Sequence, residues 1–247
     1  MRCVLPLLLA LAACGRAESN DTAKAQAGDG PAPAAMTARG PVGLYFMTRF
    51  WAGTGSLERT SWYFLPDGRV YRDLITGFTE KDLAAHAMEL GRGKLEDGVY
   101  EVTWSDGKVR KGKLEMDEDG TSFTWDMGIF TRATPFGTRP VAGTYAFAGK
   151  RGGGVMVLHR FKTLELLEDG TFRCTSDDIA QVAGQKEATS EVSALTEGTW
   201  KAEGFTMTLT SSKDGSVSRR VAFPVDDKET ERYPDWLFHG GMLYKRQ

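Results

Sequence analysis

The stretch Tyr63-Phe64-Leu65-Pro66-Asp67-Gly68-Arg69-Val70 sets an Asp-Gly pair between two apolar segments. A type I′ hairpin turn needs positive φ at both central residues, and Asp and Gly tolerate this best. From Pro41 onward, five further Asp-Gly pairs begin at Asp97, Asp106, Asp119, Asp169 and Asp214. Most of the pairs lie between short segments rich in β-branched and aromatic residues. Short strands separated by such turns predict an antiparallel meander, sandwich or barrel.

The chain also repeats itself. Three pairs of segments match in order: Gly43-Leu44-Tyr45 with Gly143-Thr144-Tyr145, Tyr63–Val70 with Glu165–Phe172, and Gly98-Val99-Tyr100 with Gly198-Thr199-Trp200. The spacing between partners is about 100 residues each time. Glycine–aromatic starts and Asp-Gly turns are common to any β meander, which is the alternative explanation. Three matches in one order favour a duplication.

Each half ends on a glycine followed by aliphatic and aromatic residues, Gly128-Ile129-Phe130 and Gly241-Met242-Leu243-Tyr244. We place the boundary near residues 137–140. This predicts a first β unit over residues 41–138 and a second over residues 139–247. The sequence leaves open whether the halves form two barrels or one continuous barrel.

One helix is expected in the first half, from Thr79 to about Leu90. Thr79 can cap its N-terminus, and Asp82 stands where a capping box places Glu or Gln. Leu83, Ala87 and Leu90 would then share one face. The first unit is therefore expected to carry one short helix beside its strands.

The N-terminus has the layout of an export signal, with Arg2 before an apolar run from Val4 to Ala13. The run is too short to span a membrane, which takes about 20 apolar residues. It closes on Leu11-Ala12-Ala13-Cys14, which resembles the lipobox of bacterial lipoproteins. The resemblance implies a signal peptide over residues 1–13 and a mature chain whose first residue, Cys14, carries the lipid. An ordinary secretory signal cut elsewhere is the alternative.

The same resemblance implies where the protein resides. Cys14 would carry a diacylglycerol and an N-acyl chain such as palmitate, and two or three chains make a stable anchor. The membrane is then a partner through this lipid. Gly15 in the second mature position implies the outer membrane if the host is Gram-negative. Residues 14–40 are poor in aromatic and β-branched residues, so we expect a lipid-anchored flexible tether.

Composition excludes some classes of partner and cross-link. The formal net charge is −2, and it becomes −3 when Arg2 leaves with the signal peptide. Near-neutral charge argues against a nucleic-acid partner, because such proteins usually carry a concentrated basic field. Cys3 leaves with the signal and Cys14 is lipidated, so Cys174 has no partner for an intramolecular disulfide. Two residues after Phe172 in an expected strand, Cys174 fits a buried, inert thiol better than a reactive one.

The pattern of each half resembles the small lipocalin-like barrels of bacterial lipoproteins and exported proteins, over residues 41–247 as two copies. Gly198-Thr199-Trp200 matches the lipocalin Gly-x-Trp, whereas the first half has Tyr100 in place of the tryptophan. Long insertions near residues 74–96 and 177–196 depart from a simple meander. The resemblance implies a mainly β fold of two tandem antiparallel barrel or meander units.

The sequence offers few residues for catalysis or metal binding. His86, His159 and His239 are isolated, and no ligand spacing or redox motif occurs. His239 precedes Gly240-Gly241 and fits a turn between the last two strands. Residues 115–126 superficially match a calcium loop but fit an acidic hairpin better. Ser105 and Lys108 match Ser-x-x-Lys on an expected turn, and the basic, glycine-rich residues 149–154 fit a hairpin tip. We expect no cofactor and no metal.

Aromatic residues crowd the start of the first half, among them Tyr45, Phe46, Phe50, Trp51, Trp62 and Phe64. In a strand, Tyr45 and Met47 face one side and Phe46 the other. Neither face is then an obvious solvent side. These residues form core, or some of them line a barrel mouth or groove that holds a ligand.

We therefore expect a lipid-anchored binding protein of the cell envelope, without catalytic activity, that holds an apolar small molecule or an envelope partner. One alternative is an envelope hydrolase that combines His159 or His239 with a nearby carboxylate. Another is a purely structural or interaction lipoprotein. The sequence identifies no catalytic or ligand-binding residue and does not set the oligomeric state.

Overall fold

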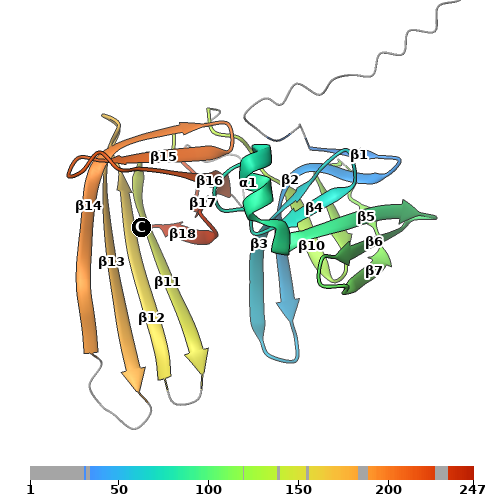
Figure 1. Cartoon of the computed structure of the whole chain (residues 1–247), viewed down its shortest axis with the longest axis horizontal. Helices are drawn as coiled ribbons and strands as arrows, with labels where there is room; N and C mark the ends of the chain where they lie inside the picture. The colour runs from blue at the N-terminus through green and yellow to red at the C-terminus, as the bar shows by residue number, and fades with distance from the viewer. Residues whose placement is uncertain are drawn as a thin grey trace, which may run out of the picture.

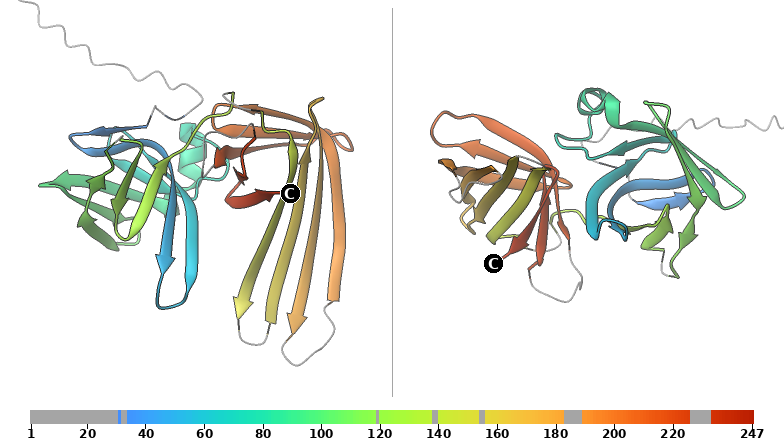
Figure 2. Two further views of the ribbon diagram at one scale, coloured as in Figure 1. Left: turned by 180° about the vertical axis from the view of Figure 1, so that it is seen from behind. Right: turned by 90° about the horizontal axis from the view of Figure 1, so that it is seen from below.

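A computed structural model describes residues 31, 34–118, 120–137, 140–153, 156–182, 189–225 and 233–247. The chain is mainly β and forms two antiparallel units that lie side by side, with one short α-helix in the first (Figure 1). The predicted fold class is confirmed, including the lone helix of the first unit. The two units are separate, which answers the question of one barrel or two (Figure 2).

The first unit is a nearly closed ring of antiparallel strands. Its strands are β1 (Ala35–Thr37), β2 (Gly40–Trp51), β3 (Ser56–Phe64), β4 (Arg69–Arg72), β5 (Leu90–Glu96), β6 (Val99–Trp104), β7 (Val109–Lys113), β8 (Glu115–Met116), β9 (Ser122–Trp125) and β10 (Gly128–Arg132). They pair in the order β7-β6-β5-β4-β3-β2-β10-β9-β8, with β1 added beside β2. Leu114 alone separates β7 from β8, so the two ends of this path are consecutive in the chain and the unit is nearly a barrel.

The second unit is a closed eight-stranded barrel. Its strands are β11 (Gly143–Gly153), β12 (Met156–Leu166), β13 (Thr171–Val182), β14 (Thr189–Glu203), β15 (Thr206–Ser211), β16 (Val217–Val225), β17 (Trp236–His239) and β18 (Met242–Arg246). Each strand pairs with the next, and β18 returns to β11. The strands β11 to β14 are long and run side by side beyond the rest of the barrel (Figure 1).

The Asp-Gly turns occur, but most are not of the predicted type I′. At Asp67, Asp106, Asp169 and Asp214 only the following glycine has positive φ. The reason is local: each of these aspartates accepts a hydrogen bond from the backbone N–H two residues on, at 2.8–3.0 Å. This Asx arrangement holds the aspartate in ordinary backbone geometry. Asp97-Gly98 has positive φ at both residues, as predicted.

The helix begins where the sequence indicates and ends early. Thr79 caps α1 (Glu80–Ala85), and Thr79 and Asp82 exchange the two hydrogen bonds of a capping box. A short 3₁₀ helix, η1 (Ala87–Glu89), follows. Leu83 is the buried residue of α1, whereas the expected helical face through Ala87 and Leu90 does not form because Leu90 begins β5.

Three apolar cores hold the molecule together. The interior of the first unit contains aromatic residues from β2, β3, β6, β9 and β10. The interior of the second barrel contains residues of β11 to β18 and of the linker before them. The third core lies between the units and joins Phe46 of β2 to Phe223 and Phe238, with ring centroids 6.3 and 6.1 Å apart.

This third core explains why both faces of β2 are apolar. Tyr45 and Met47 point into the first unit, whereas Phe46 packs against the second barrel. All three side chains are at most 9% exposed. The crowded aromatic stretch is therefore core on both sides, except at its end, where Phe50 is 60% exposed.

The two units share one register of strand pairing. Cα partners run Gly43–Phe64–Val70–Gly91–Trp104 across β2 to β6 and Gly143–Leu166–Phe172–Gly198–Ser211 across β11 to β15. Where the last strand returns to the first, Arg132 lies opposite Tyr45, and Arg246 lies opposite Tyr145. Residues in the same place in this register are called equivalent below.

The register supports two of the three sequence matches and corrects the third. Gly198 is equivalent to Gly91, not to Gly98, which lies in the turn before β6. The second half has five more residues between its turn glycine and this strand glycine, so the spacing is not constant. A Cβ at Gly91 would collide with Val102, and one at Gly198 with the backbone of Thr210. Both positions are glycine for this reason.

The ordered chain begins before the predicted domain boundary. The tether was expected to extend to residue 40, but β1 pairs with the start of β2, with Ala35 opposite Val42. The signal peptide over residues 1–13, the lipid site Cys14 and the tether up to residue 30 lie outside the described residues. So does Asp119 of the acidic hairpin.

Candidate ligand-binding site

The second barrel contains a cavity of about 410 Å³ that opens to solvent. It is lined by Ile75, Lys162, Leu164, Cys174, Leu209, Ser218, Arg220, His239, Gly240, Met242 and Tyr244. A second cavity of about 190 Å³ shares Cys174, Leu209 and Ser218 with it. Sites for small molecules usually have volumes of ~300–1,000 Å³, so the larger cavity is within this range.

The first unit contributes one wall residue to this cavity. Ile75 lies in the loop before α1, and its carbonyl accepts a hydrogen bond of 2.8 Å from the N–H of Val221 in β16. The N–H of Gly240 in turn donates to the carbonyl of Val221 at 2.8 Å. The contact between the two units therefore fixes part of the cavity wall.

The cavity arises where large residues of the first unit have small equivalents. In the first unit, Trp62 packs against Trp104 and Trp125, with ring centroids 5.3 and 5.8 Å apart. The equivalent residues of the second barrel are Leu164, Ser211 and His239. Leu164 and His239 line the larger cavity, and Ser211 lines the smaller one. Loss of three indole rings leaves space that the surrounding strands do not fill.

The mouth of the barrel differs in the same way. In the first unit, Arg49 is 1% exposed and forms an ion pair with Asp126, with 3.1 Å between Nη2 and Oδ2. Arg110 binds the same carboxylate at 3.0 Å. The equivalents of Arg49, Asp126 and Arg110 in the second barrel are Gly149, Gly240 and Ser218. The ion-pair cluster of Arg49, Asp126 and Arg110 in the first unit therefore has no counterpart at the equivalent positions of the second barrel.

Burial of the charged side chain of Arg49 is energetically unfavourable unless carboxylates pair with it. Burial lowers the pKa of Arg49, while the nearby carboxylates of Asp126 and Glu58 oppose this shift. A buried charge is tolerated when it is paired. The guanidinium also lies over the ring of Trp51, 5.2 Å from its centroid. The first unit is thus filled by aromatic rings and closed by an ion-pair cluster.

His239 is the most unusual group in the cavity. It is the last residue of β17, and Gly240-Gly241 forms the turn into β18, as the sequence predicted. The side chain is 8% exposed, and neither ring nitrogen has a hydrogen-bond partner among the described residues. Burial, with Arg220 and Lys162 nearby, lowers the pKa of His239 to about 4. At neutral pH the ring is uncharged, with one donor and one acceptor available to a ligand.

The charges that line the cavity are all positive. Lys162 and Arg220 are half-buried, and neither forms an ion pair with a carboxylate in the described part of the chain. The described lining contains no Asp or Glu. The remaining walls are largely apolar, because Ile75, Leu164 and Met242 face the space.

Cys174 faces the same cavity. It shares the inner side of β13 with Phe172, as predicted, and burial raises the pKa of its thiol. Burial also raises the pKa of the Tyr244 hydroxyl, which is equivalent to Phe130 of the first unit. A thiol with a raised pKa is a weak nucleophile, in agreement with an inert cysteine.

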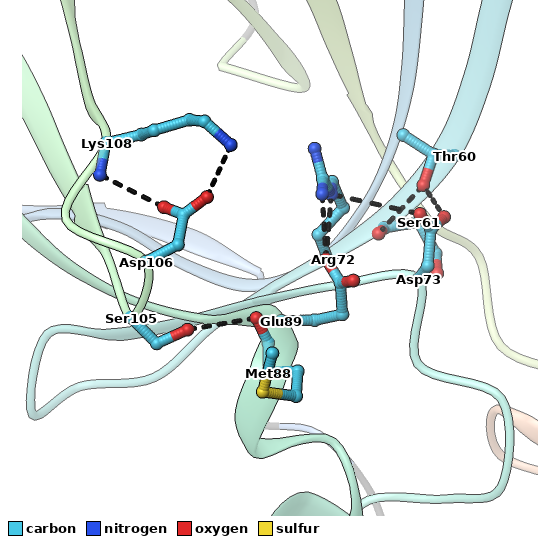
Figure 3. Close-up of polar contacts among 9 residues, drawn as sticks. All are labelled: Thr60, Ser61, Arg72, Asp73, Met88, Glu89, Ser105, Asp106 and Lys108. Atoms are coloured by element: carbon cyan, nitrogen blue, oxygen red, sulfur yellow. Dashed lines mark hydrogen bonds and ion pairs between the residues drawn. The ribbon is translucent and has the colours of Figure 1, made fainter.

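Further polar contacts, at the same end of the first unit as Arg49, also close its interior (Figure 3). Arg72 binds Glu89 at 2.8 Å and lies over the ring of Trp104, 5.3 Å from its centroid. Asp73 accepts a hydrogen bond from the hydroxyl of Thr60, and burial raises the pKa of Asp73 to about 6. Thr60 is 4% exposed, so its hydroxyl is not presented to a substrate. In the second barrel Cys174 replaces Arg72.

The Ser-x-x-Lys match does not form a catalytic pair. The hydroxyl of Ser105 donates to the carbonyl of Met88 at 3.0 Å (Figure 3). The Lys108 ammonium instead binds Asp106 at 2.6 Å. A nucleophile needs a base within hydrogen-bond reach, and here both groups have other partners.

The other candidate residues from the sequence lie apart from one another. His86 is the C-cap residue of α1, and His159 lies on β12 near Phe161. β8 and β9 pair as the strands of the expected acidic hairpin, and Asp117 accepts hydrogen bonds from Ser122. Within the described ranges, no group of three or more His, Cys, Asp and Glu side chains is placed to hold a metal ion. The hairpin tip predicted at residues 149–154 lies partly outside the described residues.

The sequence did not single out Lys162, Arg220, Leu164 or Met242. Each is an ordinary strand residue, and the signal for the site lies in the comparison of equivalent positions. Leu164 stands out only because the equivalent residue of the first unit is Trp62.

A comparison with protein-family models, curated proteins and solved structures finds no match for this chain. Of the helices described, none has the length and apolar character needed to cross a membrane.

Proposed function

We propose that this protein is a non-catalytic binding protein of the bacterial cell envelope that holds a small molecule in its second barrel. The proposal rests on one observation: the residues that fill and close the first unit are replaced by smaller or uncharged residues in the second barrel. Trp62 and Trp125 have the equivalents Leu164 and His239. The first unit then acts as a filled scaffold, and Ile75 on its loop completes the wall of the site.

We infer the location from the N-terminus. The lipobox-like Leu11–Cys14 supports cleavage before Cys14, lipidation of that cysteine and tethering to the membrane, with Gly15 favouring the outer membrane in a Gram-negative host. A near-neutral net charge supports a function without nucleic acid.

Binding is favoured over hydrolysis by the surroundings of the histidines. A general base needs a correct protonation state near the working pH and a partner that orients it. His239 has no carboxylate partner among the described residues, and the thiol of Cys174, which lines the same cavity, has a raised pKa. These features support a ligand contact rather than a catalytic role for His239.

The experiment is a binding titration with the neutral apolar dye N-phenylnaphthylamine, whose fluorescence rises in apolar surroundings. The protein is the full chain carrying Cys14→Ser, which removes the acylation site. We expect saturable binding, and we expect Leu164→Trp to abolish it by restoring the bulk that Trp62 supplies in the first unit. Leu57→Trp adds the same ring at a side chain that is 47% exposed and should leave binding unchanged.

Two results would overturn the proposal. One is the absence of saturable binding to the parent protein. The other is equal binding by the Leu164→Trp and Leu57→Trp variants, because the dye would then occupy another surface.

An envelope protein as partner is the second candidate, favoured by the exposed end of the β2–β3 hairpin. Phe50 and Leu57 lie opposite each other there and are 60% and 47% exposed. They continue the face of β2 that packs on the second barrel through Phe46. A photo-crosslinker at Leu57 should capture a protein in intact cells that the same group at Val109, 55% exposed on β7, does not capture.

A further inference from the structure

The cavity of the second barrel has an apolar body and a cationic side. Leu164, Leu209 and Met242 supply apolar surface, and Lys162 and Arg220 supply positive charge. The described lining contains no acidic side chain. Two cations that converge on one space without a carboxylate repel each other, which an anion between them would relieve.

His239 adds a hydrogen-bonding group to this cationic side. Its ring is nine-tenths buried and has no hydrogen-bond partner among the described residues. A buried polar group without a partner is costly, and such groups in native proteins usually have a bound partner. The neutral ring can donate one hydrogen bond to an oxygen of an acidic group.

The equivalent positions of the first unit do not carry this arrangement. Lys162 is equivalent to Thr60, Arg220 to Gly112, and His239 to Trp125. The first unit thus has no cation at the first two places, and the indole of Trp125 donates to the carbonyl of Tyr100 at 2.8 Å. The first unit has cations at neighbouring places, Arg49, Arg72 and Arg110, but each of them pairs with a carboxylate. In the described part of the second barrel, Lys162 and Arg220 have no such pair.

We propose that the cavity binds an acidic amphiphile, with Lys162, Arg220 and His239 holding its head group and the apolar wall holding its chain. This inference rests on the proposed binding function and specifies its ligand class. A carboxylate and a phosphate monoester share the required chemistry, because both present several acceptor oxygens and negative charge. Arg and Lys form their strongest hydrogen bonds with such groups.

The test compares head groups on one chain. Decanoate, decyl phosphate, decanol and decyltrimethylammonium are titrated by calorimetry into the full chain carrying Cys14→Ser. We expect at least one of the two anions to bind about tenfold or more tightly than decanol, because only an anionic head group forms charge-assisted hydrogen bonds with Lys162 and Arg220. The two anions distinguish a carboxylate ligand from a phosphate ligand.

Charge-removing variants assign the head group. Lys162→Met and Arg220→Met should each weaken binding of the anion about tenfold or more and leave binding of decanol unchanged. Lys201→Met is the matched control, because Lys201 is 76% exposed on β14 and pairs with Glu203. It should bind the anion like the parent protein.

The outcomes separate the inference from the function it rests on. If decanol or decyltrimethylammonium binds as tightly as both anions, the barrel binds ligands but the acidic head group is wrong. Equal anion binding by the Lys162, Arg220 and Lys201 variants would also overturn the inference. If no amphiphile binds and the neutral dye does not bind either, the binding function itself fails.

Discussion

Arg49 and Asp126 form an ion pair of 3.1 Å inside the first unit, at positions where the second barrel has Gly149 and Gly240. The Arg49 side chain is fully buried, whereas that of Asp126 is 23% exposed. One unit is therefore closed by a charge pair that needs both members, and the other has glycines at both places. This difference makes the energetics of the two units separately testable.

Asp126→Asn should destabilise the first unit by about 2–4 kcal/mol, because it leaves the buried charge of Arg49 with only the longer ion pair to Glu58, at 3.8 Å. Asparagine keeps the shape of the side chain and tolerates the φ of 47° at this position. Urea unfolding measures the change. Asp106→Asn, in the exposed pair with Lys108, should cost under about 1 kcal/mol. Equal losses in the two variants would show that Arg49 does not depend on Asp126.

Trp62→Leu should destabilise the protein by about 3–5 kcal/mol, because the indole is fully buried against Trp104, Trp125 and Phe130 and its loss leaves a cavity. The reciprocal Leu164→Trp enters space that already exists, so its effect on stability should be well under that of Trp62→Leu. Thermal unfolding of both variants checks this asymmetry. Similar losses would mean that the second barrel is as tightly packed as the first.

Lowering the pH should destabilise the protein, because His239 is buried in its neutral form. The unfolded chain binds a proton near pH 6.5, whereas burial holds the pKa of folded His239 at about 4. Between these values the unfolded state binds more protons, so stability decreases as the pH is lowered from about 6.5 to about 4. The contribution is on the order of 2–3 kcal/mol.

His239→Phe should remove this part of the pH dependence. Asp73 has a pKa raised to about 6 and contributes with the opposite sign, but it is present in both proteins and cancels in the comparison. The measurement is the unfolding free energy in urea at pH 7 and pH 4.5 for each protein. An identical decrease in the two proteins would contradict a buried neutral His239.

Lipidation is predicted to depend on Cys14 alone. Cells that express the full chain and are fed an alkyne analogue of palmitate should label the protein, and Cys14→Ser should lose the label. Cys174→Ser is the matched control and should keep it, because Cys174 lies inside the second barrel. Labelling that survives Cys14→Ser would contradict the lipoprotein assignment.

Much of the fold was predictable because its signals are local. The Asp-Gly pairs mark hairpins, since an aspartate that binds the backbone N–H two residues on favours a turn wherever it occurs. Thr79 and Asp82 mark a helix start for a similar reason, as their hydrogen bonds span three residues. The length of that helix was not predictable, because pairing of Leu90 with Tyr71 of β4 ended the helical segment.

The candidate site was not predictable in the same way. The sequence singled out His239 as a turn residue. Its burial was not predictable, because burial depends on strands that are far away in the chain. Lys162 and Arg220 come from β12 and β16, which are not neighbours in the barrel, so no spacing in the sequence connects them. The mismatch of Gly98 with Gly198 also concealed which residues of the two halves correspond.

The sequence by itself determined the β class, the turn positions, the two halves and the likeness of the N-terminus to a lipoprotein signal. The strand class, the turns and the N-terminal signal depend on residues within a few positions of one another, and the two halves on short segments that match about 100 residues apart. Only the tertiary structure decided that Phe46 is buried between the units and that the second barrel is hollow where Trp62 has the equivalent Leu164. Burial and cavity volume depend on which side chains lie against one another across the fold, and strand register determines those contacts.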